Sequence, residues 1–155
     1  MLRTHTCGEL NASHANQETS LAGWVNSARN LGGLIFIDLR DRYGITQVKI
    51  DPQTRPDLAE LASEFRSEWV IGVKGQVAAR PEEMKNAKMA TGEIEVIASS
   101  LEVFSRAQVM PFEVSDEKNG EANEALRLKY RFLDLRRPKL QKMLESKDKF
   151  ISYIR

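Results

Sequence analysis

Two glycine-containing turns divide residues 22–50 into three apolar runs, and this feature constrains the fold more than any other. The turns lie at Gly32-Gly33 and at Tyr43-Gly44. Apolar runs bounded by such residues are typical of strands joined by hairpin turns. The region therefore predicts three consecutive strands.

The middle run, residues 34–40, alternates between two faces. Its aliphatic members share one face, which is the expected core face: Ile35, Ile37 and Leu39. The intervening members share the other face: Leu34, Phe36, Asp38 and Arg40. Because successive side chains of a strand point to opposite faces, Phe36 places an aromatic ring on a face that carries charged residues.

Phe36 is the first candidate functional residue. Gln47 and Lys49 of the next run fall on the same polar face, and Arg29 belongs to the run before it. A base of a single-stranded nucleic acid can stack on an exposed ring for about 1–3 kcal/mol, while polar neighbours read the edge of the base. On pattern alone, a surface phenylalanine that a loop or a neighbouring strand covers is the commoner situation.

A helix is expected after the third strand. Proline cannot donate to a ladder, so Asp51-Pro52 should end that strand. Thr54 is the expected N-cap and Pro56 suits the first helical turn. The apolar residues that follow have helical spacing and form one stripe: Leu58, Leu61, Ala62 and Phe65.

The remaining segments complete a small barrel. Residues 19–26 form the expected first strand, residues 69–79 the fourth and residues 93–104 the fifth, with a polar loop over residues 81–91. Three strands, a helix and two strands are the element order of an OB-fold, an all-β, five-stranded Greek-key barrel with one helix between strands 3 and 4. Its binding face lies across strands 2 and 3, so the polar face around Phe36 is the face that this architecture offers to a ligand.

The sequence changes character after the barrel. We expect an OB-fold domain over residues 1–106, a linker or hinge over residues 107–137 with a linker-like stretch at 115–123, and a helix over residues 138–155. The apolar residues of this helix lie on one side: Leu140, Met143, Leu144, Ile151 and Ile154. A helical tail with an uncovered apolar side looks cut off before its partner; the alternatives are a tail folded back on the barrel or paired with a second copy.

The net charge of +1 is unevenly distributed. Residues 1–105 contain 11 Lys and Arg against 14 Asp and Glu, whereas residues 106–155 contain 12 against 8. The barrel must therefore hold a nucleic acid through local contacts, and long-range attraction to phosphate would come from the tail.

Composition narrows the class of protein. No apolar run approaches the roughly 20 residues of a membrane span, and the N-terminal residues have no apolar signal-peptide core. The single cysteine, Cys7, cannot form an internal disulfide, which favours a reducing cytoplasm. We expect Cys7 to act as a small, inert apolar residue.

Three stretches together resemble the N-terminal part of bacterial-type aspartyl-tRNA synthetases: GWVNSARNLGGLIFIDLRDRYGITQV, MATGEIEV and RLKYRFLDLRRP. The likeness covers almost the whole chain. The first stretch alone would indicate the wider group that includes the asparaginyl and lysyl enzymes, and the third narrows it to the aspartyl branch. The resemblance implies an anticodon-binding OB-fold, a hinge and the start of a class II catalytic domain.

The resemblance also implies roles for six residues in binding the anticodon GUC of aspartate tRNA. Phe36 matches the position that stacks on the central uridine, and Gln47 the position that pairs with it. Glu95 matches the reader of the first-position guanine, whose two pairing-edge N–H groups a carboxylate can accept. Arg29 matches a contact to the end of the anticodon loop, while Arg80 and Asn86 match weaker loop contacts.

Some positions depart from the family pattern. Ser27, Ala28 and Ala78 stand where relatives usually carry more arginine, so we expect a shallower salt dependence with unchanged base reading. Leu31 leans towards an enzyme strict for aspartate tRNA, because members that also charge asparagine tRNA tend to have histidine there.

The resemblance places catalysis outside this chain. No catalytic residue is expected here, because the three class II motifs, which supply ATP and Mg²⁺ binding and a dimer-interface proline, would lie beyond Arg155. His5 and His14 lack partners at metal-ligand spacing, so no metal site is expected. The parent enzyme would be a homodimer. Two alternatives stay open: a free-standing OB-fold that binds single-stranded nucleic acid, and an interaction module whose tail pairs two chains.

Overall fold

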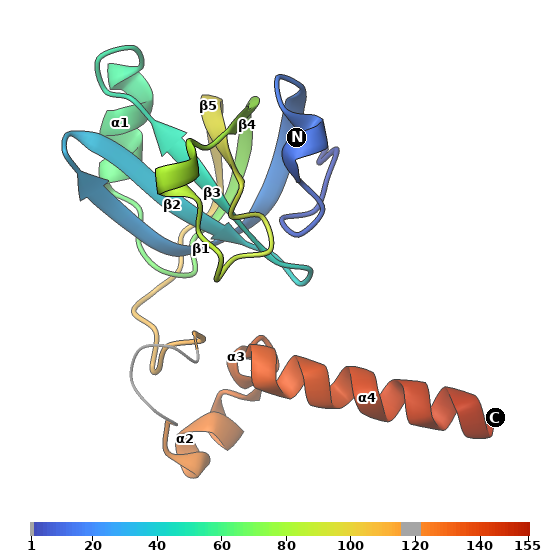
Figure 1. Ribbon diagram of the computed structural model, residues 1–155. Coiled ribbons are helices and arrows are strands. Elements are labelled where there is room, and N and C mark those ends of the chain that lie inside the picture. The colour runs from blue at the N-terminus through green and yellow to red at the C-terminus, as the bar shows by residue number, and fades with distance from the viewer. Residues whose placement is uncertain (1, 116–121) are drawn as a thin grey trace. The chain divides into compact units, whose positions relative to one another are not determined.

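In the computed structural model, which describes residues 2–115 and 122–155, the chain divides into two compact units, Met1–Gln108 and Val109–Arg155. The first unit is a closed barrel of five strands (Figure 1): β1 (Glu18–Leu31), β2 (Leu34–Arg40), β3 (Ile45–Ile50), β4 (Val70–Ala79) and β5 (Ile94–Ser105). Their order around the barrel is β1-β2-β3-β5-β4, and β4 also pairs with β1. The β3–β5 pair is parallel and the others are antiparallel. The predicted OB-fold is confirmed.

The hairpin between β1 and β2 is longer than the sequence pattern indicated. The expected first strand stopped at residue 26, but β1 continues to Leu31, which pairs with Leu34. Gly32 and Gly33 have φ of +59° and +86°, and a two-residue hairpin turn with positive φ at both positions suits the twist of the strands it joins. Because the pairing continues to Leu31, Ser27 and Arg29 lie next to β2.

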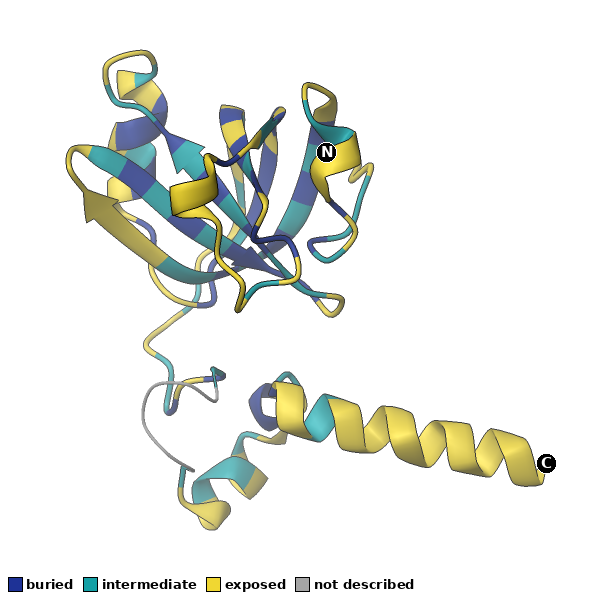
Figure 2. Cartoon of the chain, in the orientation of Figure 1, coloured by how far each residue is buried: buried dark blue, intermediate teal, exposed yellow. Residues whose placement is uncertain are grey.

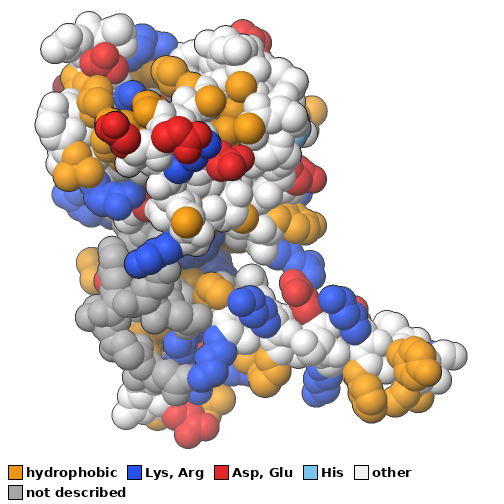
Figure 3. All heavy atoms as spheres, viewed as in Figure 1, with side chains coloured by type: hydrophobic (Ala, Val, Ile, Leu, Met, Phe, Trp, Pro, Cys, Tyr) orange, Lys and Arg blue, Asp and Glu red, His pale blue; other side chains and the backbone are white. Residues whose placement is uncertain are grey.

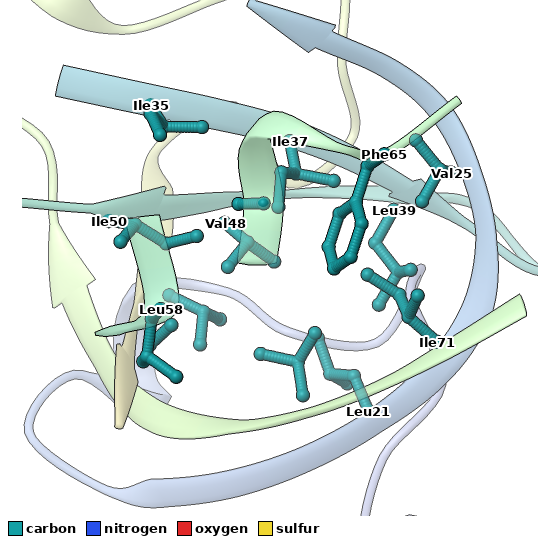
Figure 4. Close-up of a cluster of buried hydrophobic side chains, with 14 of the residues drawn as sticks. Leu21, Val25, Ile35, Ile37, Leu39, Val48, Ile50, Leu58, Phe65 and Ile71 are labelled. Carbon is teal, nitrogen blue, oxygen red and sulfur yellow. The ribbon is translucent and has the colours of Figure 1, made fainter. Parts of the chain in front are cut away.

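The core follows the predicted alternation (Figure 4). Ile35, Ile37 and Leu39 all point inward and are buried. The helix α1 (Pro56–Ser63) lies between β3 and β4 and contributes Leu58 and Ala62 to the same cluster, with Phe65 just after it. The Thr54 N-cap is wrong: the N-cap residue is Arg55, without a side-chain cap, because the Thr54 hydroxyl donates to the Asp51 carbonyl instead.

Arg40 departs from the alternation predicted for residues 34–40. Alternation placed it on the outer face, but the side chain is buried. Its Nη2 donates to Glu68 Oε1 at 2.6 Å and its Nη1 to Asn26 Oδ1 at 2.8 Å. A charge can be buried when it is paired, and Glu68 comes from the connection between α1 and β4, which alternation within one strand cannot reveal.

Two short 3-10 turns flank the barrel strands. They are η1 (Ala12–His14), before β1, and η2 (Glu82–Met84), inside the predicted polar loop.

The second unit has a small core of its own, formed by Phe112, Val114 and Leu133. It contains α2 (Glu124–Lys129), α3 (Arg131–Asp134) and α4 (Pro138–Ile154), and Pro138 opens α4 as predicted. Exposed residues follow one another along α4 (Figure 2). Most of the predicted linker-like stretch, residues 116–121, lies outside the described residues. None of the helices described here has the length and apolar character needed to cross a bilayer.

Candidate nucleic-acid interface

The strand registers bring four of the six predicted site residues to one outer face of the barrel. Arg29 of β1 pairs with Phe36 of β2, which pairs in turn with Lys49 of β3. One step along, Asp38 pairs with Gln47. Val48 of β3 pairs in parallel with Val96 of β5, so Gln47 and Glu95, which precede them, lie side by side. We call this surface the β2–β3–β5 face.

Phe36 is half-buried on this face, and it does not belong to the hydrophobic core cluster. Its ring is therefore neither bare nor sealed in the interior. A partly covered aromatic ring still presents accessible surface on which a base can stack. Gln47 is half-buried beside it and offers both a donor and an acceptor.

Asp38 organises the end of the face that is nearest to Arg29. The Ser27 hydroxyl donates to Asp38 Oδ2 at 2.6 Å, and Arg29 Nη2 lies 3.0 Å from Oδ1 and 2.9 Å from Oδ2. The guanidinium is half-exposed, so its remaining N–H groups stay accessible. Asp38 therefore holds the Arg29 side chain in a defined position on this face.

Glu95 is paired across the β3–β5 boundary. Lys49 Nζ lies 3.2 Å from Glu95 Oε1, and the two side chains are 30% and 13% exposed. Sequence reasoning placed Lys49 on the polar face but did not foresee this pair, because it depends on the parallel register of β3 and β5. Lys49 and Glu95 come into contact only in the closed barrel, where β3 and β5 are neighbours.

Arg80 is buried immediately after β4, whereas the resemblance implied a loop contact. Its Nε donates to the Ile94 carbonyl at 2.8 Å, and among the described residues its buried Nη2 has no hydrogen-bond partner. Burial lowers the pKa of Arg80, against the attraction of Glu95 and Asp38, which raises it. The guanidinium is thus a buried cation in the field of two carboxylates that serve the β2–β3–β5 face.

Asn86 is exposed in the loop between β4 and β5. Its Oδ1 accepts from the Lys88 backbone N–H at 3.0 Å, and its own N–H donates to the Gly92 carbonyl at 3.1 Å. These bonds give the loop a defined shape. The structure does not bring Asn86 into hydrogen-bond contact with the five other predicted residues within the part of the chain that it describes.

The face combines a ring, an amide, a carboxylate and a held guanidinium. Acidic, basic and hydrophobic side chains are interspersed on the barrel in the view of Figure 3. Such a surface suits stacking and edge reading of unpaired bases more than general attraction to a polyanion.

Relatives with similar sequences agree with the resemblance drawn from the motifs. The chain is 53% identical over 135 residues to an aspartate–tRNA(Asp/Asn) ligase of Chlamydia trachomatis serovar L2, covering 87% of this chain and 23% of that protein. It is 48% identical over 153 residues to the ligase of the same name from Rubrobacter xylanophilus, covering 99% and 25%. The resemblance is confirmed, and the chain spans about a quarter of the length of the curated relatives it matches.

Among solved structures, the chain is similar to asparaginyl-tRNA synthetase from Pyrococcus horikoshii, with a TM-score of 0.82 and 28% identity over 98% of this chain and 33% of that one. Residues 19–104, which include all five strands almost completely, match the family described as OB-fold nucleic acid binding domain. This match takes in more than half of the sequence, and the chain belongs to that family.

Proposed function

We propose that this chain recognises the anticodon of aspartate tRNA as the anticodon-binding domain of an aspartate–tRNA ligase. The observation that carries the proposal is that Phe36, Gln47 and Glu95, from three different strands, share one outer face of the barrel. Each supplies a different part of what reading an unpaired base requires: a stacking surface, an amide and an anionic acceptor.

In this proposal the ring of Phe36 stacks on the central uridine, and Gln47 pairs with the edge of that base. The Glu95 carboxylate accepts from the two N–H groups of the first-position guanine, which adenine does not offer. Arg29 contacts the end of the anticodon loop, and Arg80 and Asn86 add weaker contacts. The support is positional: Gln47 and Glu95 are neighbours, and Asp38, the partner of Gln47, holds Arg29.

The chemistry of the whole ligase is part of the same proposal. Residues outside this sequence would attach L-aspartate to the tRNA with ATP and Mg²⁺ in a class II catalytic domain, so this chain alone should bind without catalysing. The ligase would act as a homodimer in the cytoplasm, where protein synthesis takes place. The names of the relatives include both Asp and Asn tRNAs, whereas Leu31 leans towards strict aspartate specificity.

The proposal is tested by binding of the 155-residue chain to a fluorescently labelled aspartate tRNA transcript. Replacing the central anticodon uridine by cytidine should weaken binding by about 5- to 150-fold, because cytidine exchanges the donor and acceptor on the edge that Gln47 faces, at about 1–3 kcal/mol. A transcript with one base pair changed in the acceptor stem is the matched control. Equal affinity for all three RNAs would contradict the proposal and favour a single-strand binder without base preference.

A further inference from the structure

Glu95 is held by a lysine, Lys49, that is not among the six residues to which the resemblance assigns a role in binding the anticodon. Lys49 is the cross-strand partner of Phe36 on β3, and its Nζ reaches across the β3–β5 boundary to Glu95 Oε1 at 3.2 Å. The ion pair therefore joins the position beside the stacking ring to the carboxylate at the other side of the face.

The pair leaves the two carboxylate oxygens of Glu95 in different situations. Oε1 is engaged by Lys49, while no side chain among the described residues bonds to Oε2. The neighbouring buried cation, Arg80, directs its Nε to the Ile94 carbonyl and forms no hydrogen bond to Glu95. Lys49 thus fixes the carboxylate through a single contact to Oε1 and leaves Oε2 and the second lone pair of Oε1 available to the two N–H donors of a guanine.

Holding the carboxylate has two physical consequences. A glutamate side chain that is already fixed loses less rotamer entropy when a ligand binds, so its contact becomes more selective. An unpaired carboxylate would also repel nearby RNA phosphates, whereas the ammonium compensates its charge locally. At 13% exposure, Glu95 is shielded enough for both effects to matter.

We propose that Lys49 is a positioning residue that sets the preference of Glu95 for a base with two adjacent N–H donors on its pairing edge. The inference rests on the proposed anticodon recognition and assigns a determinant of its specificity at the first anticodon base. Lys49 acts through Glu95, and no contact of Lys49 with the base itself is required.

The test compares K49M with K74M, an exposed lysine on β4 that serves as the matched control. The probes are two aspartate tRNA transcripts with guanine or adenine as the first anticodon base. The wild-type chain and K74M should prefer guanine, and K49M should lose about tenfold of this preference, which corresponds to about 1.4 kcal/mol. K49R, which keeps a cation within reach, should restore most of it.

The salt dependence separates positioning from a plain phosphate contact. If Lys49 only bound phosphate, K49M would weaken both RNAs equally and reduce the slope of log affinity against log salt by about one, which would overturn the inference. Unchanged guanine preference in K49M would overturn it as well, while leaving anticodon recognition intact. No preference in the wild-type chain would instead contradict the proposed function. Thermal unfolding checks the fold, and K49Q replaces K49M if the latter unfolds.

Discussion

Arg29 Nη2 lies 2.9 Å and 3.0 Å from the two carboxylate oxygens of Asp38, so one guanidinium nitrogen is shared between both acceptors. The Ser27 hydroxyl donates to the same carboxylate at 2.6 Å. Among the described residues of β1, Arg29 is the one cation on the β2–β3–β5 face. Asp38 therefore restrains this cation. A carboxylate on an RNA-binding surface opposes phosphate, so its value must lie in the orientation that it gives to Arg29.

D38N should loosen Arg29 and remove one negative charge from the face. We expect affinity for all tRNAs to rise by about 1.4- to fivefold, which corresponds to the roughly 0.2–1 kcal/mol of a partly exposed ion pair, while discrimination among anticodons falls. The measurement is binding to aspartate tRNA and to its central-base variant. D57N, which releases Arg55 from an exposed pair on α1, is the control. Unchanged discrimination in D38N would show that Arg29 needs no such restraint.

Removing the Phe36 ring tests stacking directly. F36A should weaken binding of aspartate tRNA by about 1–3 kcal/mol, because the base would lose its stacking partner. F104A removes an exposed ring from β5, near its end, and should leave affinity unchanged. Isothermal titration calorimetry with both variants gives the comparison. Equal losses in the two variants would point to a general hydrophobic contact and away from a specific one.

Local patterns in the sequence predicted the barrel and part of the face. Alternation in residues 34–40 separates Ile35, Ile37 and Leu39 from Phe36, and this separation is confirmed because period two is a local property of a strand. The pairing of Glu95 with Lys49 could not be predicted in the same way, since it arises from the parallel contact of β3 with β5. The roles of the six residues in binding stay predictions.

Arg40 shows the limit of that local pattern. Its place in the alternation is that of an outward residue, yet a carboxylate 28 residues later in the chain draws it inside. The burial of Arg80 has the same origin, because the backbone carbonyl of Ile94 accepts its Nε from the next strand. Long-range partners decide the burial of both arginines, and periodicity carries no information about such partners.

The Arg40–Glu68 pair should matter for stability. R40M would leave the buried Glu68 without its guanidinium partner, and loss of one partner of a buried ion pair costs about 3–5 kcal/mol. Urea unfolding should show this as a lower midpoint with an unchanged slope. R42M, at an exposed neighbouring position, should stay within about 0.5 kcal/mol of the wild type. The double variant R40M/E68L should recover much of the loss, because it removes both charges.

Cys7 reports on the integrity of the barrel. Its side chain is fully buried, and burial raises the pKa of the thiol, with a further increase from the neighbouring Asp41 carboxylate. Since the thiolate is the reactive form, the folded chain should resist labelling by a thiol reagent, and raising the pH from about 7 to about 9 should accelerate labelling little. In concentrated guanidinium chloride one equivalent should react rapidly.

The same pKa shift has a defined effect on stability. A thiol whose pKa is raised in the folded state contributes its full stabilisation below the pKa of the unfolded thiol, about 8.5, and loses it as the pH rises above that value. Urea midpoints should therefore fall in alkaline buffer for the wild type more than for C7A, in which the titrating group is absent. Fast labelling of the folded chain, or identical pH profiles for the two proteins, would contradict the burial of the Cys7 thiol in the barrel core.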